Sequence, residues 1–192
     1  MTRNRSALLL VAGSLLVGPL VLPPTATAEP KGPLYRLVDT AAQRLATADP
    51  VAASKWINNG PPIDDPPRAA AVLDAVDADA TTHGIDPQYV RTVFTDQINA
   101  TEGIEYTRFA QWKFDPALAP NTGPDLSESR TAIDGFNKTM VDEIAVQWNL
   151  LHGPTCSTEL SQTTDAVATA RQLDPLYRQA LTSATGSYCR TT

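Results

Sequence analysis

The 192-residue sequence has few of the residues on which common catalytic motifs depend. Its only histidines are His83 and His152, and its only cysteines are Cys156 and Cys189. Neither histidine is spaced with a cysteine or a carboxylate as metal ligands usually are, so we expect no metal site. The sequence also lacks a phosphate-binding glycine loop and a dinucleotide-binding fingerprint. We therefore expect neither phosphoryl-transfer nor nicotinamide chemistry, and no cofactor.

Positive charge is also scarce. Lys and Arg number 15 against 21 Asp and Glu, which gives a net charge of −6. No basic run stands out, and a chain with this balance should repel nucleic acid and anionic membranes. If the protein binds an anion, it must do so with a few cations gathered in a pocket.

Long apolar runs are absent except at the N-terminus. There, Arg3 and Arg5 precede the run SALLLVAGSLLVGPLVL, and the small residues ATA end at Ala28. This order is typical of a secretory signal peptide, with an uncleaved anchor as the alternative. We expect cleavage after Ala28, a secreted or periplasmic protein without membrane contact, and one domain over residues 29–192.

The two cysteines lie near the C-terminus. In an exported protein, Cys156 and Cys189 are expected to form a disulfide. The bridge would close a loop of about 33 residues and join the start of a C-terminal helical hairpin to its end.

The hydrophobic pattern is helical throughout, and no segment alternates as a strand would. It predicts an all-α, single-domain bundle of about six helices. Asp-Pro pairs suit helix starts, because Asp caps the helix and Pro fits its first position. We expect such starts at Asp49-Pro50, Asp65-Pro66 and Asp86-Pro87. Asp125 or Ser127 would cap a later helix that runs to a stop at His152 to Pro154. Two shorter helices, about 156–173 and 175–188, would finish the chain.

Charged and polar side chains occupy the apolar faces of these helices. In the stretch VFTDQINATEGIEY, Gln97, Thr101 and Glu105 share one face with Phe94. Each case alone is compatible with a structural role, since an arginine can extend to water and a buried Glu can pair with an Arg. Across the chain, however, four cations on such faces stand against Glu105 alone: Arg44, Lys55, Arg68 and Arg130.

Unpaired buried charge is unfavourable, so these cations predict a pocket for a small ligand with about two carboxylates. No cysteine is free and no histidine lies on these faces, so a nucleophile with its base is missing. The predicted site can bind, orient and stabilise developing charge. It suits a binding protein or an enzyme that catalyses a unimolecular rearrangement.

Several segments resemble a known family. The stretches LVDTAAQRL, ADPVAASKW, IDPQYVRTVFTDQINATEGIEYTRF and LSESRTAIDGFN are similar, in order, to those of the secreted, gamma-subclass AroQ-type chorismate mutases of bacteria. The likeness covers nearly all of residues 29–192 and includes both cysteines. It implies an all-helical fold and the conversion of chorismate to prephenate, a Claisen rearrangement without a cofactor.

The resemblance also implies roles for the residues that match the family's motif positions. The arginines Arg44, Arg68 and Arg130 would clamp the substrate's carboxylates, and Thr101 would contact a carboxylate. Lys55 and a protonated Glu105 would donate to the ether oxygen, and Asp65 would contact the ring hydroxyl. We expect the main catalytic residues to be Lys55, Glu105, Arg44 and Arg130. Val72 departs from the pattern, because some relatives carry a polar amide there.

The resemblance implies a homodimer in which each chain builds its own active site.

Two other functions fit the residues alone. One is a secreted helical protein that binds a small dicarboxylic acid without converting it. The other is a structural or host-interacting helical protein whose inward charges pair with one another.

Overall fold

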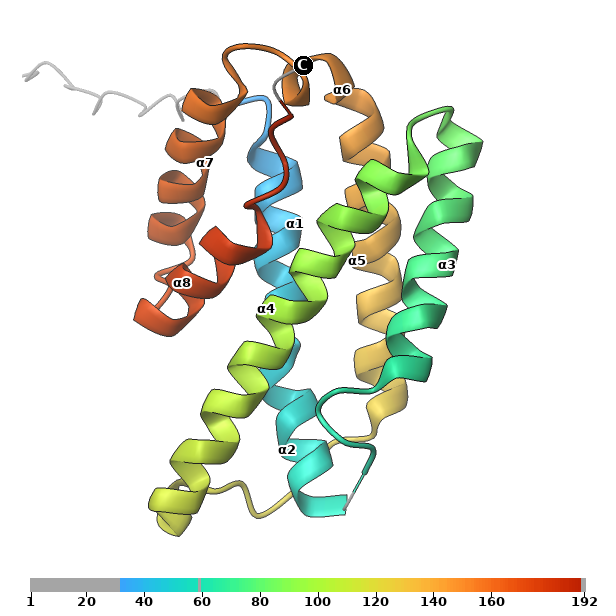
Figure 1. Ribbon diagram of the computed structural model, residues 1–192. Helices are drawn as coiled ribbons and strands as arrows, with labels where there is room; N and C mark the ends of the chain where they lie inside the picture. Colours follow the sequence, from blue (N-terminus) through green and yellow to red (C-terminus); the bar gives the residue numbers. More distant parts are fainter. Residues whose placement is uncertain (1–31, 59, 191–192) are drawn as a thin grey trace, which may run out of the picture. The chain divides into compact units, whose positions relative to one another are not determined.

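Helices account for all the regular secondary structure in residues 32–58 and 60–190, which are the residues that the computed structural model describes (Figure 1). The predicted signal peptide and its cleavage after Ala28 lie outside these residues. The prediction of an all-α fold is confirmed. The elements are α1 Tyr35–Leu45, α2 Ala48–Asn58, α3 Pro66–His83, α4 Pro87–Phe114, the 3-10 helix η1 Pro116–Leu118, α5 Leu126–Val146, α6 Trp148–Leu151, α7 Cys156–Ala170 and α8 Pro175–Ala184.

Aspartates cap α3, α4 and α5, as predicted. Asp65 accepts a hydrogen bond from the backbone N–H of Arg68 at 3.1 Å, and Pro66 takes the first position of α3. Asp86 caps α4 in the same way. For α5 the cap is Asp125, which accepts from the Ser127 N–H at 2.8 Å. Gly84 ends α3 with φ +68°, a left-handed conformation that glycine adopts without strain.

Three predicted boundaries differ from the structure. The helix α2 begins at Ala48, so the expectation that Asp49 caps it is wrong, and the Asp49 carboxylate instead contacts Arg108 Nε at 2.6 Å. The helix predicted to run toward His152 is interrupted at Gln147, which separates α5 from α6. Finally, α8 ends at Ala184, so Tyr188 lies beyond the last helix.

The long helix α4 organises the packing. It contacts α2, α3 and α8, while α1 packs against α5 and α7 (Figure 1). Large apolar side chains fill the space between these helices, and several are fully buried: Leu37, Leu45, Phe94, Ile104, Met140, Ile144 and Leu181. Burial of this apolar surface is the main force that holds the helices together. None of the helices among the described residues combines the length and apolar character needed to cross a bilayer.

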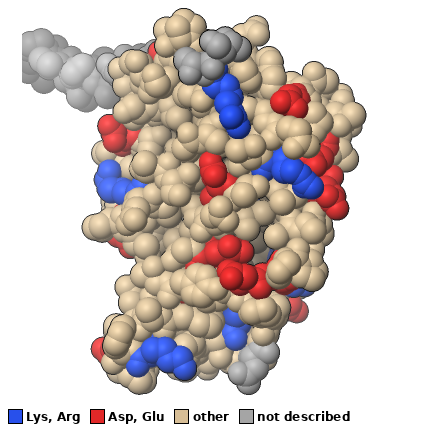
Figure 2. Space-filling view, viewed as in Figure 1, with Lys and Arg blue, Asp and Glu red and all other residues tan. Residues whose placement is uncertain are grey.

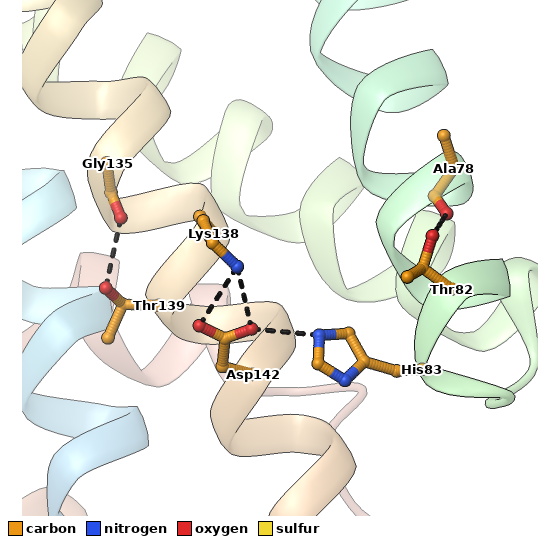
Figure 3. Close-up of polar contacts among 7 residues, drawn as sticks. All are labelled: Ala78, Thr82, His83, Gly135, Lys138, Thr139 and Asp142. Atoms are coloured by element: carbon orange, nitrogen blue, oxygen red, sulfur yellow. Dashed lines mark hydrogen bonds and ion pairs between the residues drawn. The ribbon is translucent and has the colours of Figure 1, made fainter.

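Polar contacts join α3 to α5 at the C-terminal end of α3. Figure 3 shows His83 pointing from α3 toward Asp142 of α5, with Nε2 and Oδ1 2.9 Å apart. Lys138 Nζ lies 3.1 Å from the same oxygen. The neighbouring threonines, Thr82 and Thr139, donate to carbonyls of their own helices, as helical threonines often do.

The C-terminal segment is joined covalently to the helices. Cys156 at the start of α7 is bonded to Cys189, as predicted, with Cα atoms 5.6 Å apart. This bond holds the chain that follows α8 against the rest of the bundle.

A close backbone approach connects the segment before α5 to α2. A Cβ atom on Gly123 would lie 2.9 Å from Ser54 Cα and 3.0 Å from the Ala53 carbonyl oxygen. Real Cβ atoms do not come so near to backbone, so only glycine fits at this position without a shift.

Candidate active site

A cavity lies where helices α1 to α5 and the segment before α3 meet. It holds about 650 Å³ of empty space, part of it open to solvent. All of the predicted site residues line it: Arg44, Lys55, Asp65, Arg68, Thr101, Glu105 and Arg130. The rest of the wall is largely apolar and includes Val51, Ile63, Val72, Ile98, Leu126 and Ile133.

Arg44 projects into this cavity from the last turn of α1 and is 4% exposed. Its Nε donates to Asn137 Oδ1 at 2.8 Å, and its Nη1 donates to the Gln97 carbonyl at 3.4 Å and to Thr101 Oγ1 at 3.3 Å. These acceptors are all neutral. Burial lowers the pKa of Arg44 to about 10, so the guanidinium still carries its charge at neutral pH.

Lys55 of α2 faces Glu105 of α4. Lys55 Nζ lies 2.9 Å from Glu105 Oε2, and the two side chains are 9% and 4% exposed. The Lys55 ammonium also donates to the Ile63 carbonyl at 3.0 Å, which fixes its position. The lysine and the carboxyl group are therefore held together in a largely dry environment.

The proton affinity of Glu105 is increased by its surroundings. Burial raises the pKa of its carboxyl group, and the adjacent Lys55 opposes that rise. The nearby carboxylates of Glu102 and Asp64 raise the pKa of Glu105 further. A buried acid beside other acids holds its proton to higher pH.

Two of the predicted cations differ from expectation. Arg68 Nη2 forms an ion pair with Asp134 Oδ1 of α5 at 2.7 Å, so its charge has a partner. Arg130 is exposed at the rim of the cavity instead of buried. The expectation of four unpaired buried cations is therefore wrong, although all four line one cavity.

The smaller polar residues have local partners. Thr101 Oγ1 donates to the Gln97 carbonyl at 2.8 Å and accepts from Arg44. Asp65 uses Oδ1 to cap α3 and also lines the cavity. Val72 is 4% exposed and contributes apolar wall where some relatives carry an amide.

Sequence reasoning did not assign Asn137 and Glu102 to the site. Asn137 is 6% exposed on α5 and accepts from Arg44. In the sequence, Asn137 is a polar residue on the same apolar helix face as Arg130, and this position is the signal that could have assigned it to the site. Glu102 lies one turn before Glu105 and lines the same cavity. Acidic side chains gather near the middle of the face seen in Figure 2.

The arrangement can hold a small anion with several cations and present two proton donors, Lys55 and a protonated Glu105, to one point. Among the described residues, no three His, Cys, Asp or Glu side chains come together as they would around a metal ion. Binding, orientation and charge stabilisation are the chemistry that these side chains can supply.

Comparison with known proteins reveals close relatives. A family model for chorismate mutase type II matches residues 35–106. The secreted chorismate mutase of Mycolicibacterium smegmatis is 62% identical over 167 residues, which are 87% of this chain and 92% of that protein. The secreted chorismate mutase of Mycobacterium tuberculosis is 47% identical over 195 residues, covering 99% and 97%. A crystal structure of chorismate mutase from Burkholderia thailandensis superposes with a TM-score of 0.75 at 38% identity, covering 82% of this chain and 99% of that chain.

Proposed function

We propose, from the premise that this chain belongs to the chorismate mutase family, a division of roles among the residues of its cavity. Chorismate carries two carboxylates, a ring hydroxyl and an enolpyruvyl ether. The rearrangement to prephenate breaks the ether C–O bond and forms a C–C bond within the same molecule. An enzyme can accelerate it by holding the compact conformer and by stabilising the charge that grows on the ether oxygen.

The arginines bind the carboxylates. Arg44 is the best placed, because its hydrogen-bond acceptors are neutral and leave its full charge for the substrate. Arg130 at the rim closes over a second carboxylate, and Arg68 contributes while Asp134 holds its guanidinium. Thr101 contacts the carboxylate at Arg44, and the Asp65 oxygen that does not cap α3 accepts from the ring hydroxyl.

Lys55 and Glu105 bind the ether oxygen. Negative charge develops there as the C–O bond breaks, and both groups donate to it when Glu105 is protonated. The raised pKa of Glu105 favours that protonated form. A bound dianion would favour it further, because like charges disfavour ionisation of the acid.

The observation that carries this proposal is the convergence of four cations and one buried acid in a single apolar-walled cavity. Its test is an assay of the purified chain with chorismate, which follows the loss of diene absorbance. We expect a large acceleration over buffer, abolished by a bicyclic mimic of the transition state. Tight binding of that mimic without turnover would instead identify a binding protein for a small dicarboxylic acid.

We also propose a homodimer in which each chain builds a complete active site. The support is that one chain supplies every residue assigned a role above. Activity per chain should then stay constant as the protein is diluted through the dimer-to-monomer transition, as followed by sedimentation. A fall in activity at the transition would mean that the partner contributes to the site.

The proposed location is outside the cytoplasm, as for the relatives named as secreted. Residues 1–28 would be removed after Ala28, leaving the domain 29–192. Mass spectrometry of the protein recovered from the culture fluid or periplasm should give an N-terminus at Glu29. A full-length chain in the membrane fraction would contradict this.

A further inference from the structure

Three buried polar atoms near Arg44 lack a hydrogen bond of good geometry among the described residues. They are the amide oxygen and nitrogen of Gln97 and the hydroxyl oxygen of Tyr188. Both residues are 0% exposed. Buried polar groups are nearly always paired, so unpaired groups at such a place call for an explanation. No role proposed so far uses these side chains.

Gln97 contacts Arg44 through its backbone carbonyl. It precedes Thr101 by one turn of α4, and its backbone carbonyl accepts from Thr101 Oγ1 at 2.8 Å and from Arg44 Nη1 at 3.4 Å. Its side chain is fully buried and does not line the cavity. A change at Gln97 therefore reaches Arg44 without touching the substrate.

Tyr188 is held from both sides. Its N–H donates to the Thr185 carbonyl at 3.1 Å, and its own carbonyl accepts from the Tyr89 hydroxyl. The next residue, Cys189, is bonded to Cys156. These contacts fix the backbone at Tyr188, although the residue lies beyond the end of α8.

The phenol of Tyr188 lies near both Gln97 and Arg44. Burial raises the pKa of Tyr188, as does Tyr89, while the Gln97 amide and the Arg44 cation act in the opposite direction. A hydrogen bond between the Gln97 amide and this hydroxyl pairs two of the three atoms.

We propose that Tyr188 and Gln97 are positioning residues for Arg44, and that the Cys156–Cys189 disulfide keeps Tyr188 in its place beneath the site. The Gln97 amide and the Tyr188 hydroxyl form a neutral polar layer that fixes the helix turn on which Arg44 and Thr101 rely. This inference rests on the proposed role of Arg44 as a carboxylate ligand.

The neutrality of this layer matters for binding. A carboxylate behind Arg44 would form an ion pair with the guanidinium and compete with the substrate. Neutral acceptors orient the guanidinium and leave its charge in place. Asn137 acts by the same rule from the α5 side, where its Oδ1 accepts from Arg44 Nε at 2.8 Å.

The test is a set of double-mutant cycles on the purified enzyme. Tyr188→Phe removes only the hydroxyl, and Gln97→Leu removes the amide at similar volume. We expect each to lower kcat/KM about tenfold, as misplacement of a binding group does, and the double variant to be little worse than either single variant. In the Arg44→Ala background, Tyr188→Phe should have no further effect.

The matched control is Tyr177→Phe. Tyr177 is also a buried tyrosine, but it lies on α8 near Arg108 and does not line the cavity. Its kcat and KM should match those of the unchanged enzyme. Circular dichroism and the melting temperature of each variant separate loss of folding from loss of positioning, and Gln97→Leu carries the test if Tyr188→Phe does not fold.

Reduction of the disulfide provides a second test of the proposal. Reduction of Cys156–Cys189 in the folded enzyme should lower kcat/KM in the unchanged protein and much less in Tyr188→Phe. The proposal is overturned if folded Tyr188→Phe and Gln97→Leu keep kcat/KM within about twofold of the unchanged enzyme. It is also overturned if they lower kcat/KM equally with and without Arg44. If Arg44→Ala leaves kcat/KM unchanged, the proposed role of Arg44 as a carboxylate ligand is wrong.

Discussion

Lys55 and Glu105 form a buried pair in the wall of the cavity, with Nζ and Oε2 2.9 Å apart. The pair unites the two groups proposed to donate to the ether oxygen. Glu105 can donate to that oxygen only when it carries a proton, because a carboxylate accepts hydrogen bonds and does not donate them. The protonation of this one side chain therefore decides how the activity depends on pH.

The first prediction concerns the pH dependence of catalysis. The pKa of Glu105 is raised, chiefly by burial, so activity should persist above the ordinary range of a glutamate and then fall as the proton is lost. Glu105→Gln should keep substantial activity and remove that alkaline fall, because an amide donates at any pH. A pH profile of kcat/KM checks this. Complete loss of activity in Glu105→Gln would mean that Glu105 is not a simple neutral donor.

The second prediction concerns Glu102, whose carboxylate raises the pKa of Glu105. Glu102→Gln removes this like charge, so Glu105 should lose its proton more readily and the alkaline fall should move to lower pH. The shift should vanish in a Glu105→Gln background. Glu159→Gln on α7, away from the cavity, is the control and should leave the profile in place. An unmoved profile in Glu102→Gln would show that Glu102 does not tune Glu105.

The third prediction concerns two of the cations proposed to contact the substrate. Lys55→Ala and Arg130→Ala should each lower kcat by at least about a hundredfold, as expected for removing a group that stabilises the transition state. Steady-state kinetics measures this. Lys138→Ala removes an exposed lysine that pairs with Asp142, and it should have little effect. Near-normal kcat in Lys55→Ala would remove Lys55 from the mechanism.

The fourth prediction concerns Asn137, which accepts from Arg44 Nε at 2.8 Å. Asn137→Ala should lower kcat/KM about tenfold, because the guanidinium loses its best-aligned acceptor. Asn137→Asp keeps an acceptor but adds a charge that competes with the substrate, so KM should rise. Asn149→Ala, at an exposed position of α6, is the control. If Asn137→Asp leaves KM unchanged, the neutrality of the Arg44 partners has no importance for binding.

The fifth prediction concerns the disulfide, which joins residues 33 positions apart. On the chain-entropy account, its loss should destabilise the fold by about 3–4 kcal/mol. In a domain of this size the melting temperature should then fall by roughly 10 °C. Calorimetry with and without a reductant measures this, and the double variant Cys156→Ser/Cys189→Ser should not respond to the reductant. An unchanged melting temperature after verified reduction would contradict the prediction.

The fold class, the activity and the disulfide were predictable from the sequence because each has a local signal. The caps at Asp65, Asp86 and Asp125 and the stop at Gly84 follow from backbone chemistry close to each residue. The family was recognisable from ordered motifs. The prediction that Asp49 caps α2 was wrong because a capping aspartate and an ion-paired aspartate cannot be told apart in sequence. The partner of Asp49 is Arg108, which lies far along the chain on α4.

The partners of the site residues were less predictable because they depend on packing between helices. Periodicity places Arg68 on the inward side of α3, but it does not reveal Asp134 on α5. The acceptor for Lys55 is a backbone carbonyl, which is present at every residue and has no sequence signature. Tyr188 lies beyond the end of α8, where helical periodicity no longer applies.

Gly123 restricts which residues can stand in the chain before α5, where that chain meets α2. Its backbone meets Ser54 and Ala53 so closely that any added side chain must separate the chain before α5 from α2. Arg130, near the start of α5, and Lys55 of α2 both line the cavity. The close approach of α2 and the chain before α5 thus depends on a residue that does not line the cavity. A side chain added at position 123 should therefore move α2 relative to the chain before α5, while every side chain that lines the cavity stays the same.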